Sequence, residues 1–140
     1  MVDRDVMERL LGLLEEYLND LESVRGISLE YYESDKKTRR FVERTLQIAI
    51  EACLDMGWHI IADEGLPEAE SNREVFSVLA AAGIIEPGIV SNLRDMASFR
   101  NLIVHDYGKI NDETVYRILT ERLGDFRDYA RMIVEHLRRQ

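Results

Sequence analysis

The segment from Lys36 to Asp63 constrains the fold more than any other part of the sequence. It contains no proline, and its apolar residues recur at spacings of three and four, which is the period of an α-helix. They form two stripes, of which the first is Val42, Leu46, Ala49, Cys53, Met56 and Ile60 and the second is Ile50, Leu54 and Ile61. A helix with two apolar stripes must have packing neighbours on both sides. Residues 36–63 therefore predict a long helix that packs against several others.

Two further helices are predicted in the first part of the chain. A helix over residues 3–22 would carry one apolar stripe, made of Leu10, Leu14, Tyr17 and Leu21. Residues 71–74 read Ser-Asn-Arg-Glu, which is the Ser-x-x-Glu spacing of a capping box. The short helix that this box opens is expected to end near Gly83, because glycine commonly follows the last residue of a helix.

The last part of the chain predicts two more long helices. Pro87 suits the first turn of a helix that continues through residues 89–104. A final helix over residues 112–138 can be capped by its own first residue or by the preceding Asn111. Four substantial helices and one short one predict an all-α, up-and-down helical bundle, folded as a single domain over residues 1–140.

Composition excludes several classes of site. The only cysteine, Cys53, excludes a disulfide framework and a cysteine-based zinc site. The acidic, frequently charged N-terminal stretch differs from a signal peptide, and no run approaches the roughly 20 apolar residues that a membrane helix requires. We therefore expect a cytoplasmic protein that makes no membrane contact.

The charge distribution bears on nucleic-acid binding. A net charge of −9 argues against non-specific binding, which requires a basic surface to neutralise phosphates. The acidic excess is confined to residues 1–99, which carry 10 basic and 20 acidic side chains, whereas residues 100–140 carry 8 basic and 7 acidic ones. A local nucleic-acid site therefore stays compatible with the composition.

The sequence "FRNLIVHDYG", residues 99–108, brings together three side chains that are typical of functional sites. In a regular helix, at about 100° per residue, Arg100 and His105 would point about 140° apart, and Tyr107 would point nearly opposite to His105. The three side chains can meet in one cleft only if the helix ends near His105, with Gly108 available for a left-handed or turn conformation.

This combination of side chains suits a phosphodiester. An arginine offers a planar, permanently charged fork for a phosphate, and a histidine can exchange a proton near neutral pH. RNA supplies its own nucleophile, the 2′-hydroxyl, so its cleavage needs proton transfer and charge stabilisation but no metal. An arginine and a histidine near a helix C-terminus can also simply satisfy its carbonyls and dipole. The spacing alone leaves both interpretations open.

The motif resembles that of the HEPN superfamily, in which an arginine followed four to six residues later by a histidine marks the ribonucleases. The His-x-Tyr that follows is similar to the HepT subgroup, the toxins of HepT/MntA toxin-antitoxin pairs. The segments "RRFVERTLQIAIEACLDMGWHII" and "AAGIIEPGIVSNLRDMASFRN" also resemble that subgroup. The resemblance implies a HEPN-like bundle that dimerises and acts in a type VII-like toxin-antitoxin pair. The implied activity is a metal-independent endoribonuclease that needs no cofactor.

The resemblance also implies roles for individual residues. Arg100 would bind the scissile phosphate and stabilise its developing charge, and His105 would transfer protons, together with its copy in the second subunit. Asn101 would support and orient these two groups. Tyr107 matches the tyrosine that the partner nucleotidyltransferase MntA modifies with AMP, which blocks the toxin by adding bulk and negative charge. Besides RNA and this antitoxin, a homodimer partner is implied, and a larger assembly with the antitoxin is compatible with the resemblance.

A basic cluster near the start of the long helix offers a second RNA contact. It follows Tyr31 and Tyr32, and aromatic residues interleaved with cations can hold single-stranded RNA. Its members are Lys36, Lys37, Arg39 and Arg40. We interpret these four residues as candidates that guide RNA, with simple solvation of a helix face as the alternative.

Two rival functions are compatible with the same residues. The first is a non-catalytic HEPN-type module that binds a nucleotide or a nucleotidyltransferase in the same cleft. The second is a metal-binding bundle, because Glu51, Asp55 and His59 recur at a spacing of four along one helix face. The same line of residues is also compatible with a polar line that faces the dimer cleft, or with a plain solvated helix face. Trp58, beside this line, could stack a nucleic-acid base, although packing in a core or an interface is its more common role.

Overall fold

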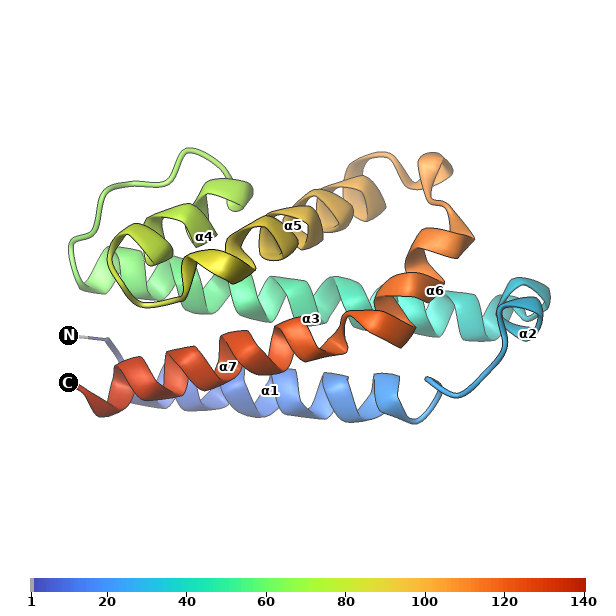
Figure 1. Ribbon diagram of the computed structural model, residues 1–140, viewed down its shortest axis with the longest axis horizontal. Coiled ribbons are helices and arrows are strands. Elements are labelled where there is room, and N and C mark those ends of the chain that lie inside the picture. The colour runs from blue at the N-terminus through green and yellow to red at the C-terminus, as the bar shows by residue number, and fades with distance from the viewer. Residues whose placement is uncertain (1) are drawn as a thin grey trace.

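Helices account for the architecture of residues 2–140, which are the residues that the computed structural model describes (Figure 1). The elements in chain order are α1 Arg4–Glu22, α2 Leu29–Ser34, α3 Lys36–Asp63, α4 Asn72–Ala81, the 3-10 turn η1 Pro87–Ile89, α5 Val90–His105, the 3-10 turn η2 Tyr107–Lys109, α6 Asp112–Glu121 and α7 Leu123–Arg138. The described chain contains no strand, so the all-α prediction is confirmed. No helix within it is long and apolar enough to cross a membrane.

The long helix α3 lies between the other helices of the bundle. In Figure 1, α1 and α7 run along one side of α3, and α4 and α5 run along the other. Both predicted stripes of α3 are buried, which confirms that this helix has neighbours on two sides. All seven α-helices contribute side chains to one hydrophobic core. This single core supports the single-domain organisation that we propose for residues 1–140.

The start of α1 and the end of α7 lie side by side (Figure 1). The guanidinium of Arg4 on α1 donates hydrogen bonds to the carbonyl of Leu137 on α7, at 2.5 Å, and to the carbonyl of Gln140, at 3.4 Å. The first and last helices are therefore joined directly as well as through the core.

The predicted boundaries of α4 are formed by local hydrogen bonds. The Ser71 hydroxyl accepts a hydrogen bond from the Glu74 amide at 3.4 Å, as a capping box requires. The Glu74 carboxylate completes the cap one residue earlier than expected, because it accepts from the Glu70 amide at 2.9 Å. At the other end, Gly83 follows the helix with a φ of +77°, a conformation that favours glycine.

The segment between α1 and α3, for which no helix was predicted, contains the short helix α2. The Ser28 hydroxyl accepts from the Tyr31 amide at 3.1 Å and caps α2, which has six residues. Tyr32 is fully buried and packs near Tyr116 of α6, with 6.0 Å between ring centroids. Tyr32 therefore belongs to the core, and in this structure its ring is not available for stacking on an RNA base.

The predicted final helix is two helices. At Arg122 the backbone leaves the helical conformation, with φ −117° and ψ 1°. The break lets α6 pack on α2 and α3 while α7 packs on α1 and α3. Gly124 directly after the break lowers the helix propensity of this segment, which reduces the cost of interrupting the helix. The apolar spacing of residues 112–138 could not reveal the break, because it continues across it.

Two glycines make a matched test of the packing around α3. A Cβ atom added at Gly57 would lie 2.4 Å from Cγ1 of Val75 on α4. Gly57→Ala should therefore lower the free energy of unfolding, by about 1–3 kcal/mol, as overpacked cores do. Gly12 is exposed in α1 with no atom within 4 Å of an added Cβ, so Gly12→Ala should raise it, by about 0.5–1 kcal/mol. Urea denaturation measures both changes, and stabilisation by both variants would contradict the close helix contact.

Candidate functional site

Helix α5 ends at His105. The three motif side chains can meet in one cleft only if the helix ends near this residue. The next residue, Asp106, has φ −150° and ψ 50°, and its amide closes the helix on the Leu102 carbonyl at 2.9 Å. The chain then makes the 3-10 turn η2. Gly108 lies in this turn without a positive φ, so the turn conformation is used and the left-handed one is not.

Arg100 is held in place by a carboxylate of α3. Its Nε donates to Oε2 of Glu51 at 2.9 Å, and its Nη1 donates to Oδ1 of Asn101 at 3.2 Å. The same Glu51 oxygen accepts a hydrogen bond from the Gln47 amide at 3.2 Å. The Arg100 side chain is 22% exposed, and within residues 2–140 its Nη2 has no hydrogen-bond partner. A fixed guanidinium with one free, accessible nitrogen can bind an anion.

His105 is exposed at the last position of α5. In the described part of the chain its imidazole forms no hydrogen bond and no ion pair. Both ring nitrogens are therefore free to exchange a proton with a bound molecule or to contact a second protein chain.

Tyr107 contacts a second carboxylate of α3. Its hydroxyl donates to Oε1 of Glu43 at 2.5 Å, and Nη1 of Arg40 lies 3.2 Å from the same oxygen. The Arg40 guanidinium also lies over the Tyr107 ring, 5.2 Å from its centroid. Partial burial, and after it the hydrogen bond to Glu43, raises the pKa of the Tyr107 phenol above its ordinary value.

The three motif residues therefore occupy neighbouring but separate contact sets. Arg100 and Tyr107 bind different carboxylates on one helix, and those carboxylates lie eight residues apart, or about 12 Å along the axis. No hydrogen bond or ion pair within residues 2–140 links Arg100, His105 and Tyr107 to one another. Helix α5 ends near His105, as a meeting of the three side chains requires. Within one chain, however, the three side chains do not form a single cluster.

Sequence reasoning missed the acidic partners of the motif. Glu43 was not singled out, and Glu51 was interpreted as a metal ligand, as part of a polar line facing a dimer cleft or as part of a solvated face, but not as the partner of Arg100. The available signal was the recurrence of acidic or amide side chains at every fourth position of the long helix, which places them along one line. These residues are Glu43, Gln47, Glu51 and Asp55.

Of the predicted basic cluster, one residue, Arg40, contacts the residues around the motif. Lys36 and Lys37 are exposed, and Arg39 donates to the Glu33 carbonyl. Arg40 is the member that contacts Tyr107 and Glu43. The cluster and the motif are therefore adjacent on the molecular surface.

A small cavity of about 80 Å³ adjoins Arg100. Its lining residues are Glu51, Leu54, Asp55, Trp58, Asn72 and Arg100. Trp58 is tied to this wall, because its indole nitrogen donates to Oδ1 of Asn72 at 3.2 Å and joins α3 to the start of α4. Burial raises the pKa of the Asp55 carboxyl above its ordinary value. The cavity offers space and polar groups beside the guanidinium.

The hypothesis of a metal site at Glu51, Asp55 and His59 is wrong. Among residues 2–140, no group of three histidine, cysteine, aspartate or glutamate side chains is arranged to hold a metal ion. The ion pair with Arg100 engages Glu51 instead. Spacing along one helix placed these residues on a line, but no second helix completes a coordination set.

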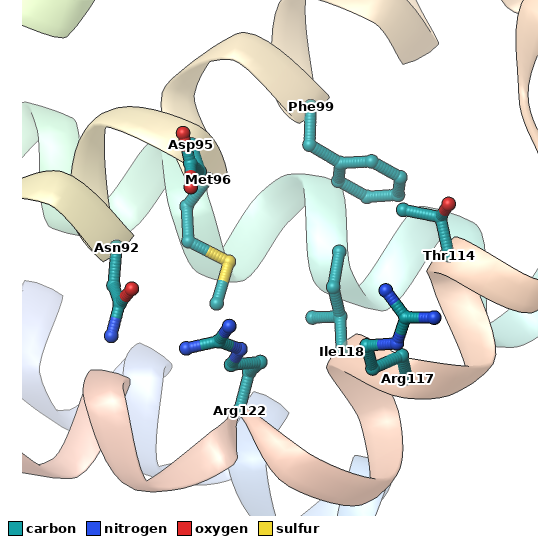
Figure 2. Close-up of a pocket in the computed structure, with 8 residues that line it drawn as sticks. All are labelled: Asn92, Asp95, Met96, Phe99, Thr114, Arg117, Ile118 and Arg122. Atoms are coloured by element: carbon teal, nitrogen blue, oxygen red, sulfur yellow. The ribbon is translucent and has the colours of Figure 1, made fainter.

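A second cavity, of about 200 Å³, lies between α5 and the junction of α6 and α7 (Figure 2). Its lining residues are Asn92, Asp95, Met96, Phe99, Thr114, Arg117, Ile118 and Arg122. The two arginines each lie 3.8 Å from a carboxylate oxygen of their own segment, Glu121 and Asp125 respectively. None of the predicted site residues lines this cavity, so it is distinct from the motif.

The fold is an all-α bundle in which an Arg-x4-His motif ends one helix beside a polar line on the longest helix. The sequence profile of the family described as ribonuclease HepT-like matches residues 14–133. The chain belongs to that family.

Known proteins of this family align over nearly the whole chain. The tRNA nuclease HepT of Aphanizomenon flos-aquae is 28% identical over 132 residues, which cover 94% of this chain and 90% of that protein. The mRNA nuclease HepT of Shewanella oneidensis is 27% identical over 129 residues, covering 92% and 96%. A solved structure of the tri-AMPylated HEPN toxin of Shewanella oneidensis in complex with the MNT antitoxin superposes with a TM-score of 0.86. It is 27% identical, and the match covers 94% of this chain and 98% of that one.

Proposed function

We propose that this chain is the toxin of a type VII-like toxin-antitoxin pair, an endoribonuclease that cleaves RNA in the cytoplasm without a metal ion. The observation that carries the proposal is the state of Arg100. Its guanidinium is fixed by Glu51 and Asn101 and keeps a free nitrogen, five residues before the exposed His105. The proposal is further supported by two relatives that are nucleases acting on tRNA and on mRNA.

In the proposed reaction the 2′-hydroxyl of RNA attacks the adjacent phosphorus. The bond from phosphorus to the 5′-oxygen breaks, which leaves a cyclic phosphate on one product and a 5′-hydroxyl on the other. Arg100 binds the non-bridging oxygens, on which negative charge develops. His105 takes the 2′-hydroxyl proton or protonates the leaving oxygen, and its copy in a second subunit performs the complementary transfer. Asn101 supports the guanidinium through Nη1.

A homodimer accounts for the position of His105. Its imidazole is exposed and forms no hydrogen bond or ion pair within residues 2–140, and two large apolar side chains are exposed on the helices that carry the site. These are Phe41 on α3 and Val104 on α5, each 41% exposed. A protein contact over this part of the molecule would remove both side chains from water, which favours association. In the proposed dimer this surface meets its copy and brings two motifs to one cleft.

The proposal also covers how RNA is bound near the motif and how the activity is inhibited. The exposed Lys36 and Lys37, together with Arg39 and Arg40, guide the RNA backbone towards the motif. An MNT-type nucleotidyltransferase transfers AMP to Tyr107 and thereby blocks the toxin, within an assembly of toxin and antitoxin. This part is supported by the AMPylated toxin complex of Shewanella oneidensis and by the 42% exposure of Tyr107.

Incubating the purified protein with mixed cellular RNA in excess EDTA tests the activity. We expect cleavage to continue in the chelator, because RNA brings its own nucleophile and the proposed site uses only protein side chains. End-group analysis should find a cyclic phosphate and a 5′-hydroxyl. Cleavage that stops in EDTA and returns with added Mg²⁺ would contradict the metal-independent mechanism. RNA or nucleotide binding without any cleavage would instead identify a non-catalytic HEPN-type binding module.

A further inference from the structure

We infer that Glu43 accepts the proton of the Tyr107 hydroxyl when a nucleotide is transferred to that hydroxyl. The toxin would then supply part of the catalytic machinery for its own modification. The inference rests on the proposed function, in which Tyr107 is the AMP acceptor, and it adds a catalytic residue on the acceptor side of the reaction.

The hydrogen-bond geometry between the two residues carries the inference. The Tyr107 hydroxyl already donates its proton to Oε1 of Glu43, at 2.5 Å. Because the proton points at Glu43, the lone pairs of the phenolic oxygen point to other directions, where an incoming phosphorus atom can meet them. Tyr107 is 42% exposed as a residue, so part of its side chain faces solvent. The proton donor and its acceptor are therefore in place before any partner binds.

The burial of Glu43 is difficult to explain by packing alone. It is 4% exposed, and it is the only charged residue in the buried core of residues 2–140. A buried carboxylate destabilises a fold unless its partners compensate the charge. The partners of Glu43 are Arg40 and the Tyr107 hydroxyl, and neither is a core residue. The buried Glu43 carboxylate therefore makes its polar contacts with residues of the surface site and not with the core.

The surroundings of Glu43 are shielded from water. The neighbouring Tyr32 is fully buried, and its hydroxyl has no hydrogen-bond partner in the described chain. Burial, and after it the negative charge of Glu43, raises the pKa of Tyr32 far above its ordinary value. A carboxylate in such a place interacts more strongly with a proton donor than one in water does, because there is less solvent to screen it.

The proposed step balances as a nucleotidyl transfer. The Tyr107 oxygen attacks the α-phosphorus of a nucleoside triphosphate that the nucleotidyltransferase has bound. A new oxygen–phosphorus bond forms, the bond from the α-phosphorus to the bridging oxygen breaks, and pyrophosphate leaves with that electron pair. The phenolic proton passes to Glu43 and then to solvent. Arg40, which contacts both Glu43 and the tyrosine ring, places positive charge beside the arriving phosphate.

The experiment measures AMP transfer to the full-length protein by its cognate MNT-type nucleotidyltransferase with ATP and Mg²⁺, followed by intact mass. Glu43→Gln is the central variant, because the amide oxygen can still accept the tyrosine hydrogen bond but the amide cannot take up the proton. We expect the first AMP addition to slow by about 100-fold, within the range of general-base contributions. Glu43→Asp, which keeps a carboxylate, should recover part of the rate. Glu113→Gln makes the same charge change at an exposed position of α6 and should leave the rate unchanged.

The number of AMP groups gives a second readout that a structural role would not move. A phenolic oxygen can be esterified only once, so any later AMP group must attach to a different hydroxyl. Glu43→Gln should therefore slow the first addition and spare later ones. An equal slowing of all additions, or a first addition at the wild-type rate in a folded Glu43→Gln protein, would overturn the inference.

Tyr107→Phe separates failure of this inference from failure of the proposed function. If Tyr107→Phe is modified as well as the wild-type protein is, or if the wild-type protein receives no AMP, the proposed control by modification at Tyr107 is wrong. If Tyr107→Phe receives no AMP while Glu43→Gln is modified at the wild-type rate, only the role of Glu43 is wrong.

Discussion

Arg100→Ala is expected to lower the rate of RNA cleavage by about 10²- to 10³-fold, the loss that follows removal of one charge-stabilising donor from an active site. Within residues 2–140 the Nη2 of Arg100 has no hydrogen-bond partner, so this fixed guanidinium can offer its charge to a phosphate. Alanine removes that charge and leaves Glu51, whose negative charge then repels the same phosphate. The combined effect should make this the most damaging substitution, together with His105→Ala.

Initial rates on a single defined RNA, measured with excess protein, provide the test. Glu51→Gln keeps a side chain that can accept from Nε but removes the ion pair, so it should cause a smaller loss, of about tenfold, through poorer orientation of Arg100. Arg131→Ala is a matched control, because this arginine is exposed on α7 and pairs only with neighbours on its own helix. It should cleave RNA like the wild type.

Unchanged cleavage by both Arg100→Ala and His105→Ala would remove these residues from the reaction. If Arg100→Ala lost activity and also its circular dichroism signal, the Glu51 contact would be structural. A folded and inactive variant is the result that supports catalysis.

Tyr107→Phe is expected to abolish protection by the nucleotidyltransferase. The variant lacks the hydroxyl that accepts AMP, so it should keep cutting RNA in the presence of the antitoxin and ATP, whereas the wild-type protein should stop. In the wild-type protein an AMP ester at this oxygen cannot donate to Glu43, and it brings a phosphate charge beside that carboxylate. We therefore expect the modified tyrosine to move away from Glu43. Because Tyr107 lies two residues after His105, this movement takes place close to the end of α5.

RNA cleavage after preincubation with the nucleotidyltransferase and ATP measures this effect, and intact mass reports the modification in the same samples. Tyr31→Phe is the matched control, since Tyr31 is the other strongly exposed tyrosine, at 50%. It should be modified and inhibited normally. Complete inhibition of Tyr107→Phe would place the controlling modification on another residue.

The sequence predicted those parts of the fold that local rules determine. The capping serine at Ser71 and the glycine at Gly83 mark the ends of α4, and the unbroken apolar spacing of residues 36–63 defines α3 to the residue. The break at Arg122 could not be predicted, because it depends on which neighbours α6 and α7 pack against. Periodicity reports which face of a helix is apolar, but it does not report where the direction of the helix changes.

In the candidate site, too, local features could be predicted from the sequence, whereas contacts between distant segments could not. Helical geometry required the helix to end near His105 if the three side chains were to meet, and α5 ends at that residue. The partners of Arg100 and Tyr107 lie 49 and 64 residues earlier in the chain, so no local rule connects them. Glu51 looked like a metal ligand because it was viewed along α3 alone. Its true partner comes from another helix, and only the packing of α5 on α3 reveals it.

The rigid spacing on α3 restricts which length changes the family can accept. Glu43 and Glu51 belong to one uninterrupted helix, so deleting a single residue between them would rotate one carboxylate by about 100° relative to the other. Either Arg100 would then lose its contact with Glu51, or Tyr107 would lose its hydrogen bond to Glu43. We therefore expect alignments of active relatives to be free of gaps between these two positions, even where the intervening residues differ.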